Sequence, residues 1–279
     1  MTVQNTGATA VDVLAGTLTL LAGTTIQMAG TSQAHRAGIT VEGTGKLVAK
    51  IASGRVSVIK NTAQGIRVIG RGSVDLEGVV TSNTGTIPTT YNGTIVISQN
   101  SEADIELNQT GATPPLNTIK GVLATGSVTS DGLLIRGGTA AYVRRSVFVG
   151  NGLSGIHLSY TGTKANGNSD MTAVDLGKTA DLGLNVVQGA NDQLNNKGSG
   201  ICININPTPV QVVSAQGQPL LCCRLQHHSR CPDQKRWRLR TCRHRTGRSR
   251  LGVVEHHEYL ESHGGRGEVQ QLIPSHRCA

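Results

Sequence analysis

A short motif, glycine followed by alternating apolar residues, recurs along most of the chain and constrains its fold more than any other feature. The motif occurs as GITV at 38, GIRV at 65, GTIVI at 93, GLLI at 132, GIHL at 155, GLNV at 183 and GICINI at 200. A second short alternating segment follows several of these, as SVDLEG at 73, ADIELN at 103, SVFVGN at 146 and AVDLGK at 173. Alternation with period two indicates β-strands, and no convincing helical spacing of apolar residues occurs in 1–216.

Strands repeated every 20 to 30 residues and separated by Gly, Asn, Ser and Thr turns are typical of a β-solenoid, whose stacked coils bury one continuous core. On the first strand of each coil, the side chains expected to point inward are Ile66, Val68, Leu133, Ile135, Ile156, Leu158, Leu184, Val186, Ile201 and Ile203. On the second strand they are Val74, Leu76, Ile105, Leu107, Val147, Val149, Val174 and Leu176. Turn or stacking positions are expected for Asn151, Asn168 and Asn195.

Three segments carry a resemblance to a known class: NGLSGIHLS at 151, AQGIRVIGRGSVDLEG at 63 and the stretch from 170 to 205. They resemble coils of the right-handed parallel β-helix repeat, the pectate-lyase-like superfold, and the last resembles the terminal coils of predicted secreted bacterial β-helix proteins. The resemblance covers roughly 35–216 and implies a fold more than a function, because this superfold hosts lyases, hydrolases, adhesins and scaffolds. A left-handed hexapeptide helix fits less well because no strict six-residue period is present. A β-sandwich would show hairpin signals, and the Asn-Gly at 92–93 has no clear partner strand before it.

We therefore predict an all-β chain in three parts: partial N-terminal coils in 1–34, a right-handed parallel β-helix in 35–216, and an irregular or disordered tail in 217–279. No stretch reaches the roughly 18 apolar residues that a membrane span requires, and no basic region typical of a signal peptide precedes the apolar start. Because the strands of 1–34 lack a polar or helical cap, we infer a truncated or late start with a signal peptide upstream. A secreted or cell-surface location is expected.

The segment 217–279 differs sharply in composition from the rest of the chain. It holds 12 of the 26 Lys and Arg, 7 of the 9 His and 5 of the 6 Cys, so it carries a formal charge of +7 against +2 for 1–216. Three interpretations were compared: a zinc site, for which the Cys and His spacings are irregular; an Arg-rich nucleic-acid arm containing Trp237; and a shifted reading frame. Deleting one C after the Gly217 codon, with permitted codons, restores a Thr-, Gly-, Asn- and Val-rich sequence. We therefore interpret 217–279 as a frameshift product and do not favour nucleic acid as a partner.

Four residues occupy the outward position of the second strands and are expected to form one column across the coils, roughly 4.8 Å apart per coil: Asp75, Glu106, Phe148 and Asp175. Paired carboxylates on such a face are what a glycosidase uses as acid and as base or nucleophile, or what Ca²⁺ would need as ligands. A solvated polar face is the alternative interpretation. An insertion at 107–131 is expected to interrupt the column.

Arg144, in the segment GGTAAYVRR, is the candidate catalytic cation. Beside a carboxylate site it would ease proton abstraction α to a sugar carboxylate; a surface cation is the alternative. The outward column of the first strands is expected to contain Thr40, Arg67, Leu134, His157, Asn185 and Cys202, with His157 as a weaker candidate base. GTGKLVAK at 43–50 superficially resembles a phosphate loop, but it lacks the first glycine and the following Ser or Thr, and no helix is expected after it.

Three function hypotheses follow. The first is a non-enzymatic secreted or surface β-solenoid whose polar flank contacts polysaccharide or the cell envelope, without a cofactor other than a possible Ca²⁺. The second is a polysaccharide lyase or glycoside hydrolase that uses Asp75, Glu106 and Arg144. The third is nucleic-acid binding through the basic tail. We rank them in this order, and an enzyme requires that its acids converge beside a cation in one groove.

Overall fold

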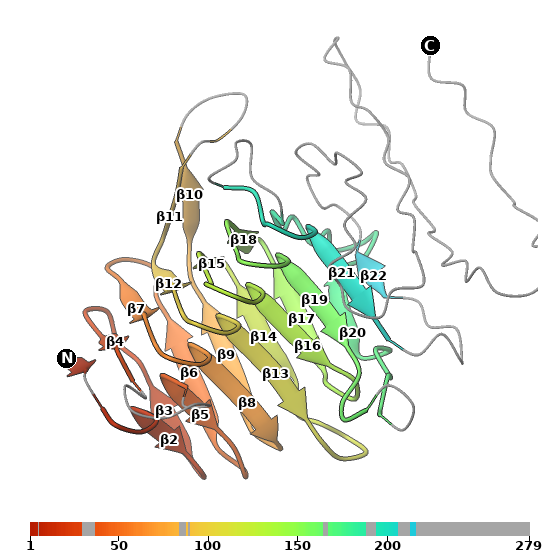
Figure 1. Cartoon of the computed structure of the whole chain (residues 1–279), viewed down its shortest axis with the longest axis horizontal. Coiled ribbons are helices and arrows are strands. Elements are labelled where there is room, and N and C mark those ends of the chain that lie inside the picture. Colours follow the sequence, from red (N-terminus) through yellow and green to blue (C-terminus); the bar gives the residue numbers. More distant parts are fainter. Residues whose placement is uncertain are drawn as a thin grey trace, which may run out of the picture.

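The computed structural model is all-β, with stacked parallel sheets of many strands (Figure 1). No helix is present among the residues that it describes, which are 1–4, 6–29, 37–83, 88, 90–163, 167–187, 194–205 and 213–215. The segment 217–279, with its candidate frameshift, zinc and nucleic-acid interpretations, lies outside the described residues.

Twenty of the described strands belong to three parallel sheets. Sheet A contains β1 (Thr2–Gln4), β4 (Thr25–Gln27), β7 (Val56–Ile59), β12 (Ile95–Ser98), β15 (Val122–Thr125) and β18 (Val147–Val149). Sheet B contains β2 (Val11–Val13), β5 (Ile39–Val41), β8 (Ile66–Gly70), β13 (Ile105–Gln109), β16 (Leu133–Arg136), β19 (Ile156–Ser159) and β21 (Ile201–Asn204). Sheet C contains β3 (Thr17–Thr19), β6 (Lys46–Lys50), β9 (Ser73–Glu77), β14 (Asn117–Lys120), β17 (Ala141–Arg144), β20 (Val174–Gly177) and β22 (Ser214–Ala215).

From β1 to β20, apart from β10 and β11, successive strands visit the sheets in the order A, B, C, and from the second pass on each pairs in parallel with the strand one pass earlier. We call one such pass a coil. The strands β21 and β22 then extend sheets B and C. Figure 1 shows the coils following one another along the long axis, from β2–β4 at one end to β19–β21 at the other. This arrangement is compatible with a parallel β-helix. The strands expected in 1–34 are present as β1–β4.

The core lies between the three sheets and consists of columns of inward apolar side chains that stack in register. On sheet B, for example, Ile39, Ile66, Ile105, Leu133 and Ile156 are paired strand by strand and are each at most 1% exposed. The inward assignments made for β8, β9, β13, β16, β19 and β20 are confirmed.

Each coil has three strands, whereas the sequence prediction assumed two. This difference explains where the predicted alignment was wrong. ADIELN forms β13, which pairs with β8 and β16 of sheet B, whereas GTIVI contributes β12 to sheet A. Residues 107–131 are not an insertion: they complete β13 and form β14 and β15 in regular register. GLNV at 183 is not a sheet B strand, since Val186 bridges Val147 and Leu184 is 44% exposed.

The orientation of β18 is the reverse of the prediction. Phe148 points into the main core, where it is 0% exposed and lies beside the small Ala124 of β15. Val147 and Val149 face the other side of sheet A, where they form a separate cluster with Val96 and Leu123. The sequence Val-Phe-Val is apolar at every position, so its alternation could not indicate which face is inward.

This second cluster, which we call the outer patch, is covered by the one antiparallel hairpin of the described residues. The hairpin consists of β10 (Val80–Ser82) and β11 (Tyr91–Gly93), and it projects from the coils in Figure 1. Val80 and Tyr91 pack against the outer patch. The Asn-Gly at 92–93 therefore does have a partner strand before it, and the hairpin is the true insertion in the repeat.

Buried asparagines stack at the corner between sheets A and B. The backbone N–H and Nδ2 of Asn61 both donate to Asn100 Oδ1, at 3.1 and 2.8 Å. Asn151 donates to Asn196 Oδ1 in the same way, at 2.9 and 3.0 Å. Stacking was correctly expected for Asn151. Asn168 occupies a turn, the other position expected for it, since its Oδ1 accepts from Asp170 N at 2.8 Å. The stacking contacts near Asn195 are made by the neighbouring Asn196.

Candidate functional site

Glu106 lies on the outer face of sheet B, in register with Arg67 on one side and Leu134 on the other. Its side chain is only 5% exposed. Arg67 Nε lies 3.7 Å and Arg136 Nε 3.2 Å from its two carboxylate oxygens, and Gln64 Nε2 donates to it at 2.8 Å. The negative charge of Glu106 is therefore balanced by two guanidinium groups.

On the same outer face of sheet B, His157 of β19 pairs with Asp131, which lies just before β16. His157 Nδ1 lies 3.0 Å from Asp131 Oδ2, and Asp131 Oδ1 accepts from Ser154 N at 2.9 Å. The predicted outward column of Thr40, Arg67, Leu134, His157 and Cys202 is confirmed, with Glu106 added between Arg67 and Leu134. Asn185 is not part of it: it is buried and donates to the carbonyls of Val143 and Leu176.

Asp75 lies on a different sheet, on the outer face of β9 in sheet C. Lys46 Nζ and Lys50 Nζ lie 3.5 and 3.4 Å from Asp75 Oδ2. Lys50 also contacts Glu77 at 2.9 Å, and this hydrogen bond together with the charge of Asp75 raises the pKa of Lys50. Asp75 is thus one member of an exposed ladder of alternating charges.

Arg144, on β17 of sheet C, is buried and fully engaged. Its side chain is 3% exposed, NH2 contacts Asp175 Oδ1 and Nε contacts Asp181 Oδ2, both at 2.9 Å. The guanidinium carbon lies 4.0 Å from the centre of the Tyr142 ring. The hydrogen bond that Tyr142 donates to Asp181 is the main cause that lowers the pKa of Asp181. These contacts hold the Arg144 side chain in place against its neighbours on sheet C.

The structure does not bring the three predicted catalytic residues together. Asp75 and Asp175 do share an outward column of sheet C, through Thr118 and Tyr142. Glu106 lies on sheet B and Phe148 points into the core from sheet A, so the predicted four-residue column is wrong. Arg144 belongs to a neighbouring column with Glu77 and Lys120.

Asp75→Asn is expected to change the free energy of unfolding by less than about 1 kcal/mol, because ion pairs with exposed lysines contribute little. Asp175→Asn is the matched control and is expected to cost more, since Asp175 holds the buried Arg144. Urea denaturation of the two variants measures the difference. Equal costs would mean that Asp75 has a structural role that its exposed partners do not indicate.

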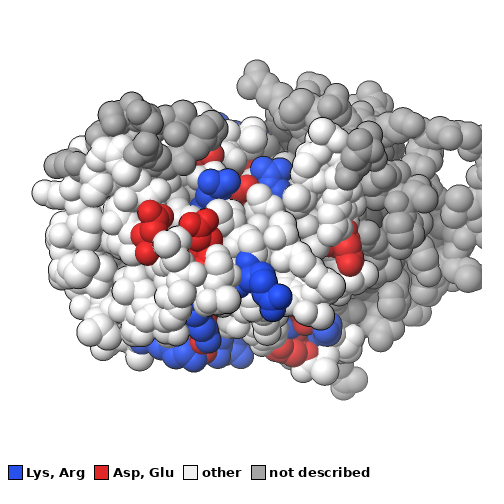
Figure 2. Space-filling view, turned by 90° about the horizontal axis from the view of Figure 1, so that it is seen from below, with Lys and Arg blue, Asp and Glu red and all other residues white. Residues whose placement is uncertain are grey.

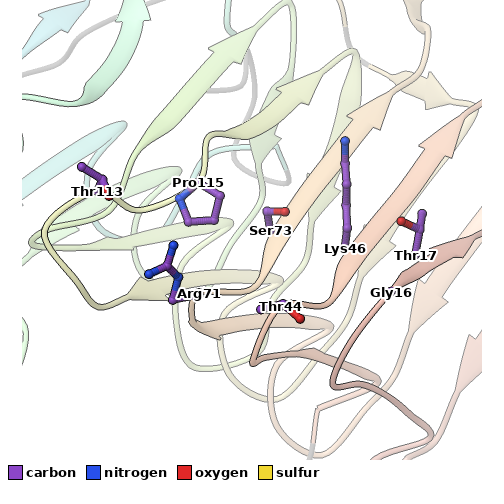
Figure 3. Close-up of a pocket in the computed structure, with 8 residues that line it drawn as sticks. All are labelled: Gly16, Thr17, Thr44, Lys46, Arg71, Ser73, Thr113 and Pro115. Carbon is purple, nitrogen blue, oxygen red and sulfur yellow. The ribbon is translucent and has the colours of Figure 1, made fainter.

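A shallow open groove lies at the corner where sheet B passes into sheet C, with a volume of about 430 Å³. Figure 3 shows Thr17, Lys46 and Ser73 side by side on β3, β6 and β9, with Arg71 and Pro115 beside them. The remaining lining residues are Gly16, Thr44 and Thr113. The lining therefore combines two cations with four hydroxyl groups and includes no carboxylate.

Glycines allow neighbouring turns to pack closely at this corner. Gly45 and Gly72 immediately precede β6 and β9, and the Lys46–Ser73 pairing places them at equivalent positions. A Cβ on Gly45 would lie 2.1 Å from Val13 O, and one on Gly72 would lie 2.3 Å from Val41 O. Neighbouring turns thus approach so closely that no side chain fits between them. Lys46 directly follows Gly45 and Arg71 directly precedes Gly72, so both cations lie where these turns stack, and both line the groove.

Sequence reasoning missed this groove, although Lys46 lies in the GTGKLVAK segment that was compared with a phosphate loop. That segment forms a turn and the strand β6, and no helix follows it. A usable signal was present: a glycine directly before Thr17, Lys46 and Ser73, at the start of three successive sheet C strands. Because each coil was counted with two strands, these positions were not aligned.

Among the described residues, no group of three or more His, Cys, Asp or Glu side chains is arranged to hold a metal ion. In the same part of the chain, no helix has the length and apolar character needed to cross a membrane. Figure 2 shows Lys and Arg side chains interspersed with Asp and Glu over a largely uncharged face. Comparisons with protein-family models, curated proteins and solved structures find no match to this chain.

Proposed function

We propose that the chain is a right-handed parallel β-helix of the pectate-lyase-like superfold that acts as a non-enzymatic binding scaffold for polysaccharide. In this proposal it is secreted or displayed on the cell surface, and its polar flank contacts glycan or cell envelope. The observation that carries the proposal is the open groove of hydroxyl groups and cations on the B–C corner. Thr17, Lys46 and Ser73 occupy equivalent positions on three successive coils, roughly 4.8 Å apart per coil, which lets a linear sugar polymer make polar contacts with several coils along its length.

The predicted catalytic residues are each engaged in ion pairs. Asp75 is paired with two exposed lysines, Arg144 is buried against Asp175 and Asp181, and Glu106 is held between two arginines. They do not form one site with acids converging beside a cation, as the lyase hypothesis requires.

Glycoside hydrolysis is a second candidate, favoured by one observation on sheet B. Gln64 Nε2 donates to Glu102 Oε2 at 2.7 Å and to Glu106 Oε2 at 2.8 Å, so these oxygens are separated by no more than the two distances together, about 5.5 Å. Retaining glycosidases hold their carboxyl groups about 5–5.5 Å apart. However, Glu106 is almost fully buried and paired with arginines, which restricts its access to a substrate.

Binding and hydrolysis can be distinguished by incubating the full chain with soluble polysaccharides, once in the presence of Ca²⁺ and once in the presence of EDTA. The scaffold proposal expects retention on polysaccharide by affinity electrophoresis and no new reducing ends. Release of reducing ends that Glu106→Gln abolishes would replace the scaffold proposal with the hydrolase. Absence of binding to every polysaccharide would refute the scaffold function.

A further inference from the structure

Arg71 stands out among the cations of the groove because it has no carboxylate partner among the described residues. It is exposed, and it lies in the turn between β8 and β9, between Gly70 and Gly72. The other arginines on these faces are engaged: Arg67 and Arg136 contact Glu106, and Arg144 contacts Asp175. An unpaired guanidinium beside a hollow is a donor available to a ligand, and its planar fork matches carboxylate and sulfate oxygens.

The Lys46 ammonium can contact a ligand together with Arg71 without leaving the Asp75 carboxylate unpaired. Its only ion pair among the described residues is with Asp75, at 3.5 Å, and Lys50 lies 3.4 Å from the same carboxylate oxygen. If the Lys46 ammonium turns toward a ligand, Lys50 still neutralises Asp75. The groove therefore offers two positive charges at little electrostatic cost to the surface around it.

The hydroxyl groups of the groove favour a sugar as the carrier of the negative charge. Thr17, Thr44, Ser73 and Thr113 lie around the two cations. Hydroxyl groups both donate and accept hydrogen bonds, as do the hydroxyl groups of a sugar ring.

We propose that this groove binds the acidic group of an anionic polysaccharide, a carboxylate or a sulfate ester, through Arg71 and Lys46. The proposal rests on the proposed polysaccharide-binding function and specifies its ligand class. Arg71 supplies the charged hydrogen bonds, Lys46 supplies a second positive charge, and the hydroxyl groups contact the neighbouring sugar.

The test uses dextran and dextran sulfate oligosaccharides of equal length, with binding to the full chain measured by calorimetry at low and high salt. Arg71→Gln is expected to weaken binding of dextran sulfate about tenfold, the loss of one charged hydrogen-bonding group, and to leave dextran binding unchanged. Arg55→Gln is the matched control, since Arg55 is an exposed arginine in the turn between β6 and β7, at the opposite end of the sheet C strand. The basic segment 217–279 contributes equally to all three proteins, so the ratio between variants isolates the groove.

The outcomes separate the specific inference from the general function. A tenfold loss confined to dextran sulfate and to Arg71→Gln, reduced at high salt, supports the proposal. Equal loss in Arg71→Gln and Arg55→Gln, or no loss in either, overturns it while binding of dextran preserves the scaffold function. Failure to bind either oligosaccharide overturns both. Single-stranded DNA that competes equally, with the same dependence on Arg71, overturns the assignment to a sugar ligand.

Discussion

Phe148→Ala is expected to destabilise the protein by about 3–5 kcal/mol, the usual cost of truncating a fully buried phenylalanine. Phe148 is the largest fully buried side chain of the described residues and is 0% exposed. Its neighbour across the sheet, Ala124, is too small to fill the resulting cavity. The measurement is the free energy of unfolding from urea denaturation of the full chain.

This substitution also tests the orientation of β18. If Val147 and Val149 pointed into the core, Phe148 would lie on the outer face, and its truncation would cost much less than that of Val147. The structure places the valines in the outer patch, which is a smaller cluster than the main core. Val147→Ala is therefore expected to cost clearly less than Phe148→Ala, and the opposite order would contradict the orientation.

Asp104→Asn is expected to stabilise the protein at pH 7 by about 1–3 kcal/mol, on the scale of the desolvation cost of one buried polar group, because a neutral amide neither buries a charge nor takes up a proton when the chain folds. Asp104 is 0% exposed at the asparagine corner between sheets A and B. Asn100 Nδ2 donates to Asp104 Oδ1 at 2.8 Å, but Asp104 Oδ2 has no partner. Burial raises the pKa of Asp104 well above 3.8 and outweighs the hydrogen bond from Asn100. Asparagine keeps the shape and the Oδ1 acceptor and has no group that titrates.

The sign of the pH dependence follows from the raised pKa. Near pH 3.5 the carboxyl group is mostly protonated in both the folded and the unfolded chain, so the variant and the wild type should differ little. As the pH rises above 3.8, the unfolded chain releases this proton before the folded chain does, and the wild type loses stability until the folded pKa is passed. The advantage of Asp104→Asn should therefore grow between pH 3.5 and pH 7.

Denaturation of both proteins at these two pH values measures the change, and taking the difference removes the contribution of the other carboxylates. Some of these act in the opposite direction, since hydrogen bonds from Thr172 lower the pKa of Asp170. An advantage that is equal at both pH values, or a loss of stability at pH 7, would contradict a protonated Asp104. A loss of stability at pH 7 would mean that the Asp104 carboxylate stabilises the stacked asparagines through its contact with Asn100.

Much of the fold could be predicted from local patterns. Alternation of apolar and polar residues fixes which face of a strand is buried wherever only one face is apolar, as in Ile66–Arg67–Val68 and Val74–Asp75–Leu76. Both pairs of apolar residues were correctly assigned to the core. The same reasoning failed at Val147–Phe148–Val149, where both faces are buried and the alternation carries no information.

The candidate site was harder to predict, because it depends on which strands become neighbours. Glu106 was correctly identified as an outward acid, but its partners Arg67 and Arg136 come from the coils on either side. A strand count per coil that is wrong by one moves each segment to another sheet. Asp75 and Glu106 were placed in one column for this reason, although they belong to sheets C and B.

By itself, the sequence determined that this is an all-β chain of repeated short strands, because the period-two alternation and the glycine-rich turns are local properties of the polypeptide. It also determined which face of a strand is buried where only one face is apolar, as at Ile66–Arg67–Val68. Only the tertiary structure decided the number of strands per coil, the face that Phe148 occupies, and the meeting of Lys46, Arg71 and Ser73 in one groove. These features depend on contacts between residues far apart in the chain, and the close approach of the turns at Gly45 and Gly72 arises only when the coils pack.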